Sequence, residues 1–410
     1  MLLSIAQTWA YNFCVDNIYY NKTSTNEVKV TFKSYGTGSY SGDVVIPSTV
    51  SYDGVSYSVT GIGANAFYKC TDLTSVKLPE SVTFIDGYSF SGCSALTSIN
   101  LPASVDSIDA YAFERCFALT DIDIQGPIKV LKDGVFNLCD KLATVKLPAT
   151  VTSIGNSAFY GCGELTSIEI PESVTTIGKS AFSCCSKLAS ITMPASLTTI
   201  GELAFYQCTK LPSLEFPQPL TSIGKNAFYY CTTMTSISLS NSLTTIADYA
   251  FSGCKGLTTL TLPESVTTIG TKAFYNCPFT EIKSLNPEVP TTANNAFYVE
   301  TYIYKIYEKC QVYVPTGSLD AYKAATEWSN FANFSEIPVE TAITDVATGV
   351  ADARIRIAGS SICVESNEAV RIVAVSGATL FAGQGNAEVA VGKGVYVVKI
   401  GDKATKVVVR

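Results

Sequence analysis

The chain has 410 residues and a formal net charge of −7, and 47% of its residues are hydrophobic and 15% charged. Its Lys and Arg residues are scattered singly, which argues against a nucleic-acid-binding surface, because such surfaces cluster basic residues. The sequence contains no histidine. This excludes Ser-His and Cys-His nucleophile pairs and removes the commonest metal ligand. Carboxylate chemistry stays open, and we expect neither a metal nor a cofactor.

Residues 1–10 are apolar and end in small or turn-tolerant residues. We interpret them as the remnant of a secretory signal peptide whose basic start is missing, or alternatively as an ordinary N-terminal strand. No later stretch approaches about 18 uninterrupted apolar residues, so we predict no transmembrane helix.

Residues 11–58 are expected to form an N-terminal β cap. Residues 27–32 alternate between polar and apolar with period two, which predicts a strand. Asp53-Gly54 favours a tight hairpin turn. Residues 44–50 match the second half of a unit that recurs through the next part of the chain. A cap is needed here because a bare terminal rung would expose the core of a repeat array.

Residues 59–300 consist of a 23-residue unit, in which eleven phenylalanines and ten cysteines recur at a constant interval. These residues are Phe67, Phe90, Phe113, Phe136, Phe159, Phe182, Phe205, Phe228, Phe251, Phe274 and Phe297, with Cys70, Cys93, Cys116, Cys139, Cys162, Cys185, Cys208, Cys231, Cys254 and Cys277. Such a period is the signature of a leucine-rich-repeat solenoid. We predict stacked parallel β-strands joined by short helical turns.

Within one copy, residues 73–79 predict a first strand that ends at a proline corner, and residues 82–85 predict a second strand. The Ala-Phe pair that follows is expected on a helical or 3₁₀ turn. Gly63 and its equivalents precede that turn, and we expect them to have positive φ. Stacked cysteines lie too far apart for disulfides. We therefore predict a ladder of buried free thiols instead of a metal site.

The first strand carries a variable outward column, which we predict to be a partner-binding surface. Its members are Lys77, Asn100, Asp123, Lys146, Glu169, Thr192 and Glu215, and Ser238 and Thr261 continue it. Columns of Ser and Thr run beside it and along the second strand. They either present a flat polar surface to a partner or simply suit a solvated parallel sheet.

A second outward column is aromatic, because tyrosine often follows the repeat phenylalanine. Its candidate partner-binding members are Tyr68, Tyr160, Tyr206, Tyr229 and Tyr275, and Tyr298 and Tyr230 add to it. Tyrosine is favoured at contact surfaces with proteins and glycans. Alternatively, these rings pack on one another along the turns.

One copy, residues 119–136, loses the usual Pro-x-Ser-Val corner and gains Asp121, Asp123, Lys132 and Asp133. This copy is either a repeat whose sequence has drifted without functional consequence or a functional site.

Residues 301–338 are predicted to close the array with a strand at 310–315 and a helix at 316–325, followed by Trp328, Phe331 and Phe334. Residues 339–350 have the character of a linker. Residues 351–410 alternate in short runs with turns at Ser376-Gly377 and Gly401-Asp402, which predicts a small antiparallel β-sandwich.

The pattern L-x-x-[VI]-x-[LI]-P-x-[ST]-V-x-x-I-G-x-x-A-F-x-x-C, over residues 42–338, resembles the BspA-like (Treponema pallidum type) leucine-rich repeats. The final domain, with Ser376-Gly377 and residues 394–399, resembles the C-terminal sorting domains of Bacteroidetes surface proteins, although the usual Asp and Arg around Ser-Gly are missing. The resemblance implies a secreted or surface-anchored, adhesin-like protein that binds host or bacterial extracellular proteins. It also implies a place on the outer membrane of a Gram-negative bacterium, and carries over no catalytic residue.

We therefore expect a monomeric binding protein that is not an enzyme and recognises other proteins through its repeat surface. Glycan binding through the tyrosines and a passive stalk are the alternatives. A glycosidase would need two acids about 5–10 Å apart in a cleft. Asp121 with Asp123, or Glu169 with its neighbours, could meet that distance, but the sequence gives no sign of a concavity.

Overall fold

The computed structural model describes residues 11–34, 38–300, 305–337, 353–358, 361–374, 379–391 and 394–409. The chain divides into two compact units, Met1–Ser335 and Glu336–Arg410. The predicted signal-peptide remnant 1–10 and the linker 339–350 lie outside the described residues, and the domain limits drawn from the sequence stay predictions.

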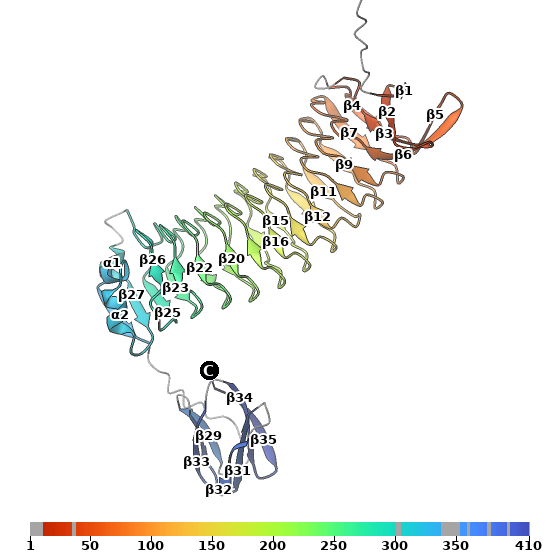
Figure 1. Ribbon diagram of the computed structural model, residues 1–410. Coiled ribbons are helices and arrows are strands. Elements are labelled where there is room, and N and C mark those ends of the chain that lie inside the picture. The colour runs from red at the N-terminus through yellow and green to blue at the C-terminus, as the bar shows by residue number, and fades with distance from the viewer. Residues whose placement is uncertain are drawn as a thin grey trace, which may run out of the picture. The chain divides into compact units, whose positions relative to one another are not determined.

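The first unit is a solenoid in which each repeat contributes two short strands to two stacked series (Figure 1). The first series consists of β7 (Leu73–Lys77), β9 (Ser98–Asn100), β11 (Asp121–Asp123), β13 (Thr144–Lys146), β15 (Ser167–Ile168), β17 (Ser190–Ile191), β19 (Leu214–Glu215), β21 (Ile237–Ser238), β23 (Thr259–Leu262) and β25 (Glu281–Ser284). The second series consists of β8 (Phe84–Ile85), β10 (Ser107–Ile108), β12 (Val130–Leu131), β14 (Ser153–Ile154), β16 (Thr176–Ile177), β18 (Thr199–Ile200), β20 (Ser222–Ile223), β22 (Thr245–Ile246), β24 (Thr268–Ile269) and β26 (Thr291–Thr292).

The repeat itself sets the register of both series. Strands of consecutive repeats pair in parallel with equivalent residues opposite each other, so that Ile154 lies opposite Ile177 and Val76 opposite Ile99. Equal spacing therefore places every apolar position over its copy, and one hydrophobic core runs from Phe13 to Phe331. This confirms the predicted parallel solenoid.

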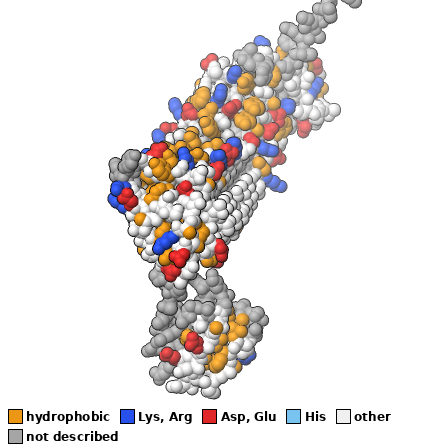
Figure 2. Space-filling view, turned by 60° about the vertical axis from the view of Figure 1, so that its left-hand side comes forward, with side chains coloured by type: hydrophobic (Ala, Val, Ile, Leu, Met, Phe, Trp, Pro, Cys, Tyr) orange, Lys and Arg blue, Asp and Glu red, His pale blue; other side chains and the backbone are white. Residues whose placement is uncertain are grey.

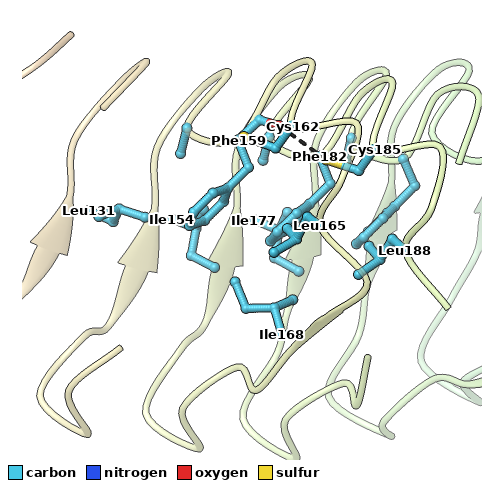
Figure 3. Close-up of a cluster of buried hydrophobic side chains, with 14 of the residues drawn as sticks. Leu131, Ile154, Phe159, Cys162, Leu165, Ile168, Ile177, Phe182, Cys185 and Leu188 are labelled. Atoms are coloured by element: carbon cyan, nitrogen blue, oxygen red, sulfur yellow. Dashed lines mark hydrogen bonds between the residues drawn. The ribbon is translucent and has the colours of Figure 1, made fainter. Parts of the chain in front are cut away.

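The centre of that core is a stack of the repeat phenylalanines. All ten consecutive pairs between Phe67 and Phe297 have ring centroids 4.8–5.8 Å apart and planes within 16° of parallel. Figure 3 shows Phe159 and Phe182 pointing into the same interior as Ile154, Ile177 and Leu165. A single rung could not bury these rings, because each one covers the face of its neighbour.

The expected helical turn takes the form of consecutive β-turns. In the first copy the amide of Tyr68 donates to the carbonyl of Asn65 at 3.0 Å, and the amide of Cys70 donates to the carbonyl of Phe67 at 3.0 Å. Asn65 and Lys69 both have positive φ, at 58° and 55°. Alternating left-handed residues cannot continue a helix, so the segment stays a tight turn.

The expectation that the repeat glycines have positive φ is wrong, because the left-handed residue lies two positions later. At Gly155, Gly178, Gly201, Gly224 and Gly270, a Cβ would come within 2.5–2.7 Å of backbone atoms of the preceding rung. Glycine is therefore required by the close approach of two backbones.

The repeat cysteines form the predicted ladder of buried free thiols. Within the described array, the Sγ of each one from Cys93 to Cys277 donates to the carbonyl oxygen of the phenylalanine 26 residues earlier, at 3.0–3.3 Å. That oxygen also accepts the amide of the cysteine in its own repeat. The thiol thus satisfies the second acceptor site of a buried carbonyl.

The N-terminal end is closed by a group of strands that pair partly antiparallel and partly in parallel. They are β1 (Phe13–Val15), β2 (Ile18–Lys22) and β3 (Glu27–Thr31), followed by β4 (Gly42–Val45), β5 (Thr49–Tyr52) and β6 (Val55–Ile62). β3 pairs in parallel with β6, which begins the second series, and β4 pairs in parallel with β7. β5 and β6 form the predicted hairpin around Asp53-Gly54, in which both turn residues have positive φ.

The C-terminal end is closed by α1 (Ile306–Lys309), β27 (Gln311–Val314), α2 (Leu319–Ala324), the 3₁₀ helix η1 (Trp328–Asn330) and β28 (Asn333–Glu336). The buried Trp328 indole donates to the Thr292 hydroxyl at 2.9 Å. The carboxylate of Glu327 accepts the amide of Asn295 at 2.9 Å. In earlier rungs that amide donates to a carbonyl of the next rung, so a side chain replaces the missing rung.

The second unit contains β29 (Arg354–Ala358), β30 (Ser361–Glu365), β31 (Ala369–Ala374), β32 (Thr379–Gln384), β33 (Ala387–Ala390), β34 (Gly394–Ile400) and β35 (Lys403–Val409). They form two antiparallel sheets, β29-β30-β33 and β32-β31-β34-β35, around a separate core, as expected of a small sandwich. The Gly401-Asp402 turn is present, whereas Ser376-Gly377 lies outside the described residues.

Candidate functional site

The predicted variable column exists as a row of exposed side chains on the first strand series. Lys77, Asn100, Asp123, Lys146, Glu169, Thr192 and Glu215 are all exposed. Lys77 lies opposite Asn100 and Asp123 opposite Lys146 in adjacent rungs. The structure thus brings these residues together, and their role in binding stays a prediction.

Two members of the column are already engaged by their neighbours. The Asn100 side chain accepts the amide of Leu78 at 3.1 Å and donates to its carbonyl at 3.4 Å, so it ties two rungs together. The Lys146 ammonium lies 3.6 Å from the Asp123 carboxylate, and both side chains are exposed. An exposed ion pair of this kind contributes little to stability.

The middle of the column lies in a groove of about 650 Å³, whose lining residues come from three successive repeats. They are Val145, Lys146, Leu147, Ala149, Glu169, Ile170, Pro171, Glu172 and Thr192. The sequence shows no sign of this groove. Sequence periodicity could not reveal this groove, because it depends on how far neighbouring rungs separate.

The Ser and Thr columns have a clear structural role. On the second strand series, threonines at a 23-residue spacing donate their hydroxyl to the carbonyl of the preceding rung at 3.0–3.4 Å. Corner hydroxyls from Ser81 to Ser265 do the same at 2.6–2.7 Å. Figure 2 shows a long band along the array that carries neither charged nor hydrophobic side chains. These contacts favour the interpretation of a solvated sheet.

The tyrosines of the last repeats gather into one group, which we call the tyrosine cluster. It consists of Tyr206, Tyr229, Tyr230, Tyr249, Tyr275 and Tyr298. Tyr206 and Tyr229 stack with centroids 5.1 Å apart at 4°, and Tyr229 contacts Tyr230 at 4.7 Å. Tyr275 stacks on Tyr298 at 6.0 Å. The rings thus pack on one another, as the alternative interpretation expects, and their role in partner binding stays a prediction.

Lysines cover the ring faces of the cluster. The Lys272 ammonium lies 4.6 Å from the Tyr275 ring centroid and 5.9 Å from that of Tyr249. Lys225 approaches Tyr249, at 5.8 Å, and Lys255 approaches Tyr230, at 5.9 Å. Such cation–π contacts hold long lysine side chains in place over the rings.

The phenols of the cluster influence one another electrostatically. Burial, followed by the neighbouring phenols Tyr230, Tyr206 and Tyr249, raises the pKa of Tyr229. Burial and a hydrogen bond to the Glu300 carboxylate raise the pKa of Tyr275 to about 12. Tyr229 and Tyr275 therefore present neutral hydroxyl groups at physiological pH.

Tyr68 and Tyr160 lie apart from the cluster, because Ser91, Asn137 and Ser183 occupy the equivalent positions of the neighbouring repeats. Sequence analysis missed Tyr249 and a second stacked pair, Tyr88 and Tyr111, with centroids 5.1 Å apart at 9°. All three precede a repeat phenylalanine by two residues. The same 23-residue comparison, applied to that position, would have found them.

The irregular copy keeps its place in the stack. Asp121 and Asp123 lie on β11, which pairs in register with β13. Asp133 accepts both the amide and the side-chain amide of Asn156, at 2.7 and 3.1 Å. A Cβ on Gly126 would lie 1.7 Å from the carbonyl oxygen of Val105. The changed residues thus make contacts between rungs. This favours the interpretation that the copy has drifted in sequence and is not a functional site.

Two observations limit the chemistry of the site. Within the described ranges, no group of three or more His, Cys, Asp or Glu side chains could hold a metal ion. Among those same residues, every helix is too short or too polar to cross a bilayer. The arrangement offers a contact surface built from phenols, ammonium groups, carboxylates and a groove.

Comparison with known proteins supports this architecture. The model of the BspA type leucine rich repeat region matches residues 60–188, 129–245 and 221–314, with six copies. No curated protein matches the chain.

Several solved structures are similar to the chain. A leucine-rich repeat protein from Bacteroides ovatus is 27% identical over 80% of this chain and 100% of its own, with a TM-score of 0.47. The leucine-rich repeat protein of T. pallidum is 30% identical over 49% of this chain and 91% of its own, with a TM-score of 0.43. A leucine rich cell surface protein from Faecalibacterium prausnitzii is 24% identical over 79% and 94%, with a TM-score of 0.44.

The three matched ranges overlap and together run from residue 60 to residue 314, which is more than half of the chain. The chain belongs to the family of proteins built on the BspA type leucine-rich repeat region.

Proposed function

We propose that this protein recognises other proteins outside the cell, as an adhesin-like secreted or surface-anchored binding protein of a Gram-negative bacterium. Family membership points to protein recognition in general. The solenoid presents a long continuous surface between two closed ends, which suits the binding of extended partners. The partners we expect are host or bacterial extracellular proteins.

The tyrosine cluster is the observation that carries this proposal. Six tyrosines and three lysines converge on adjacent turns, where stacking and cation–π contacts hold their side chains in place. Ordered aromatic side chains lose little conformational entropy on binding, and tyrosine is enriched among residues that dominate protein interfaces. Tyr298 is 41% exposed, which is high for a large aromatic residue.

The geometry of the cluster favours a protein over a glycan. Sugars stack on an open ring face, but Tyr206 and Tyr229 cover each other's faces with their planes at 4°. Lys272 occupies a face of Tyr275 at 4.6 Å. The cluster also carries hydroxyl and ammonium groups beside its rings, and this combination matches the mixed polar and apolar surface of a protein.

The test is capture of partners from an extracellular-matrix extract by the full chain, followed by affinity measurement with the purified partner. Replacing Tyr206, Tyr229 and Tyr230 together by Ser should weaken binding by about tenfold or more. Tyr88→Ser with Tyr111→Ser is the matched control, because it removes a stacked pair outside the cluster, and it should leave affinity unchanged.

Three results would contradict the proposal. Equal affinity of both variants would exclude the cluster as the binding surface. Binding on a glycan array without any protein partner would favour the glycan alternative. The absence of any partner at micromolar concentration would favour a passive stalk.

A further inference from the structure

The groove formed by residues 145–149, 169–172 and 192 has a specific position in the solenoid. It lies at the corner that follows the first strand, across the repeats of β13, β15 and β17. Three members of the predicted column, Lys146, Glu169 and Thr192, line it. It is therefore part of the surface to which the proposed function assigns recognition.

The two strand series differ in how their rungs are joined. On the opposite side, β12, β14, β16, β18 and β20 form one continuous sheet. On the groove side, β11-β13 and β15-β17 are separate two-stranded sheets. The same series is also interrupted between β9 and β11, between β17 and β19, and between β21 and β23, so the groove lies on the face where the strands pair only in short groups.

The floor of the groove is apolar. Val145 and Ile170 are buried, with 8% and 4% of their surface exposed, and Leu147 and Pro171 are partly exposed beside them. An apolar side chain placed here would remove further surface from water, at about 25 cal/mol per Å².

The rim of the groove carries two carboxylates, Glu169 and Glu172, and one ammonium group, that of Lys146. Lys146 is held by Asp123 at 3.6 Å. Glu172 accepts the amide of Ala195 at 3.1 Å through one oxygen, which leaves its charge uncompensated. Among the residues that the structure describes, no cation forms an ion pair with Glu169 or Glu172. A ligand that complements this groove therefore carries a positive charge next to an apolar group.

We propose that the groove binds an extended peptide segment of a partner protein in which a lysine or arginine lies next to an apolar residue. The apolar side chain rests on Val145, Leu147 and Ile170, and the cation lies between Glu169 and Glu172. The segment is short, because the groove spans three rungs at about 4.8 Å each and an extended chain rises about 3.3 Å per residue. This proposal rests on the proposed function and names the chemistry of the partner at one place.

The test uses the full chain and a blocked peptide in which lysine, valine and lysine are flanked by glycines, with fluorescence anisotropy as the readout. Glu169→Gln with Glu172→Gln should reduce the affinity by about tenfold, since each cation–carboxylate contact contributes up to about 1 kcal/mol. Glu80→Gln with Glu281→Gln is the matched control, because it removes two exposed carboxylates that lie outside both the groove and the variable column, and it should have no effect. Replacing the valine of the peptide by glycine should also weaken binding.

The proposal is overturned if the peptide does not bind, or if both double variants weaken its binding equally, as general charge attraction would. The same variants are then tested on the protein partner captured from matrix. A partner that binds the wild type and the Glu169/Glu172 variant equally would exclude the groove and leave the proposed function standing. Peptide binding without any protein partner would support the groove and contradict the proposed function.

Discussion

The thiol of Cys185 lies 3.1 Å from the carbonyl oxygen of Phe159, two residues that are 26 positions apart and belong to adjacent rungs. The same contact recurs from Cys93 to Cys277. It joins the two strictest positions of the repeat, because the carbonyl of one rung's phenylalanine is satisfied by the next rung's cysteine. The cysteine therefore both packs in the core and donates a hydrogen bond, and its replacement should lower the free energy of unfolding.

Cys185→Ala should lower the free energy of unfolding by about 1–2 kcal/mol. It removes a sulfur atom from a packed core and leaves the Phe159 carbonyl with one donor fewer. Urea denaturation followed by circular dichroism measures this change. Cys184→Ala is the matched control, since Cys184 is only partly buried, and it should cost less than about 0.5 kcal/mol. Equal effects at both positions would show that the hydrogen bond contributes nothing.

Most of the fourteen thiols should be unreactive in the native protein. Eleven cysteines are buried, while Cys14 is exposed and Cys184 and Cys363 are partly buried. The thiolate is the reactive form, and burial raises the pKa of Cys139 to about 12. Ellman's reagent should therefore label at most three thiols at pH 7.5, and all fourteen after denaturation. Fast labelling of more than three would mean that the ladder opens readily.

The stability of the solenoid should fall steeply as the pH rises above about 8.5. Burial raises the pKa of the Cys116, Cys162 and Cys208 thiols well above the ordinary value. At pH 9.5 the unfolded chain has thus lost protons that the folded chain still holds, and the free energy of unfolding decreases with pH. Below the unfolded pKa of about 8.5 these thiols give no dependence.

Each fully shifted thiol contributes a slope approaching about 1.4 kcal/mol per pH unit. Urea midpoints at pH 7.5, 8.5 and 9.5, with a reducing agent present, measure the combined effect. The variant Cys162→Ala with Cys185→Ala removes two such groups and should show a shallower decline above pH 8.5. A decline identical to that of the wild type would show that these thiols are not the cause.

The sequence predicts those features that depend on one repeat and its copy. The spacing of Phe159 and Phe182 predicts their stacking, and the apolar pattern around Ile154 and Ile177 predicts the parallel register. Outward positions such as Lys146 and Glu169 are also predictable, because they alternate with buried neighbours.

Features that depend on distances between rungs are not predictable in this way. The groove at Glu169 is formed by side chains of three successive rungs, and nothing in the local pattern marks where these side chains leave a hollow. The tyrosine cluster combines three repeat positions, those of Tyr249, Tyr275 and Tyr230, which lie near one another only after the turns have folded. The sequence correctly predicts where the repeat glycines lie in the unit, but the positive φ expected of them is wrong.

The reason for those glycines can be tested at Gly201. A Cβ there would lie 2.6 Å from the carbonyl carbon of Gly178 and from the amide nitrogen of Lys179. Both atoms belong to the backbone of the neighbouring rung and cannot rotate away. Gly201→Ala must therefore separate two rungs, and we expect it to lower the free energy of unfolding by about 2–3 kcal/mol.

Gly163→Ala is the control, because the atom nearest to its added Cβ would lie 4.0 Å away. Since its φ lies outside the left-handed region, this control should be neutral or stabilise the protein by up to about 1 kcal/mol, through a lower entropy of the unfolded chain. Urea unfolding compares the two variants. If Gly201→Ala destabilised the protein no more than Gly163→Ala, the two rungs would have room for a side chain. Glycine would then not be required at position 201.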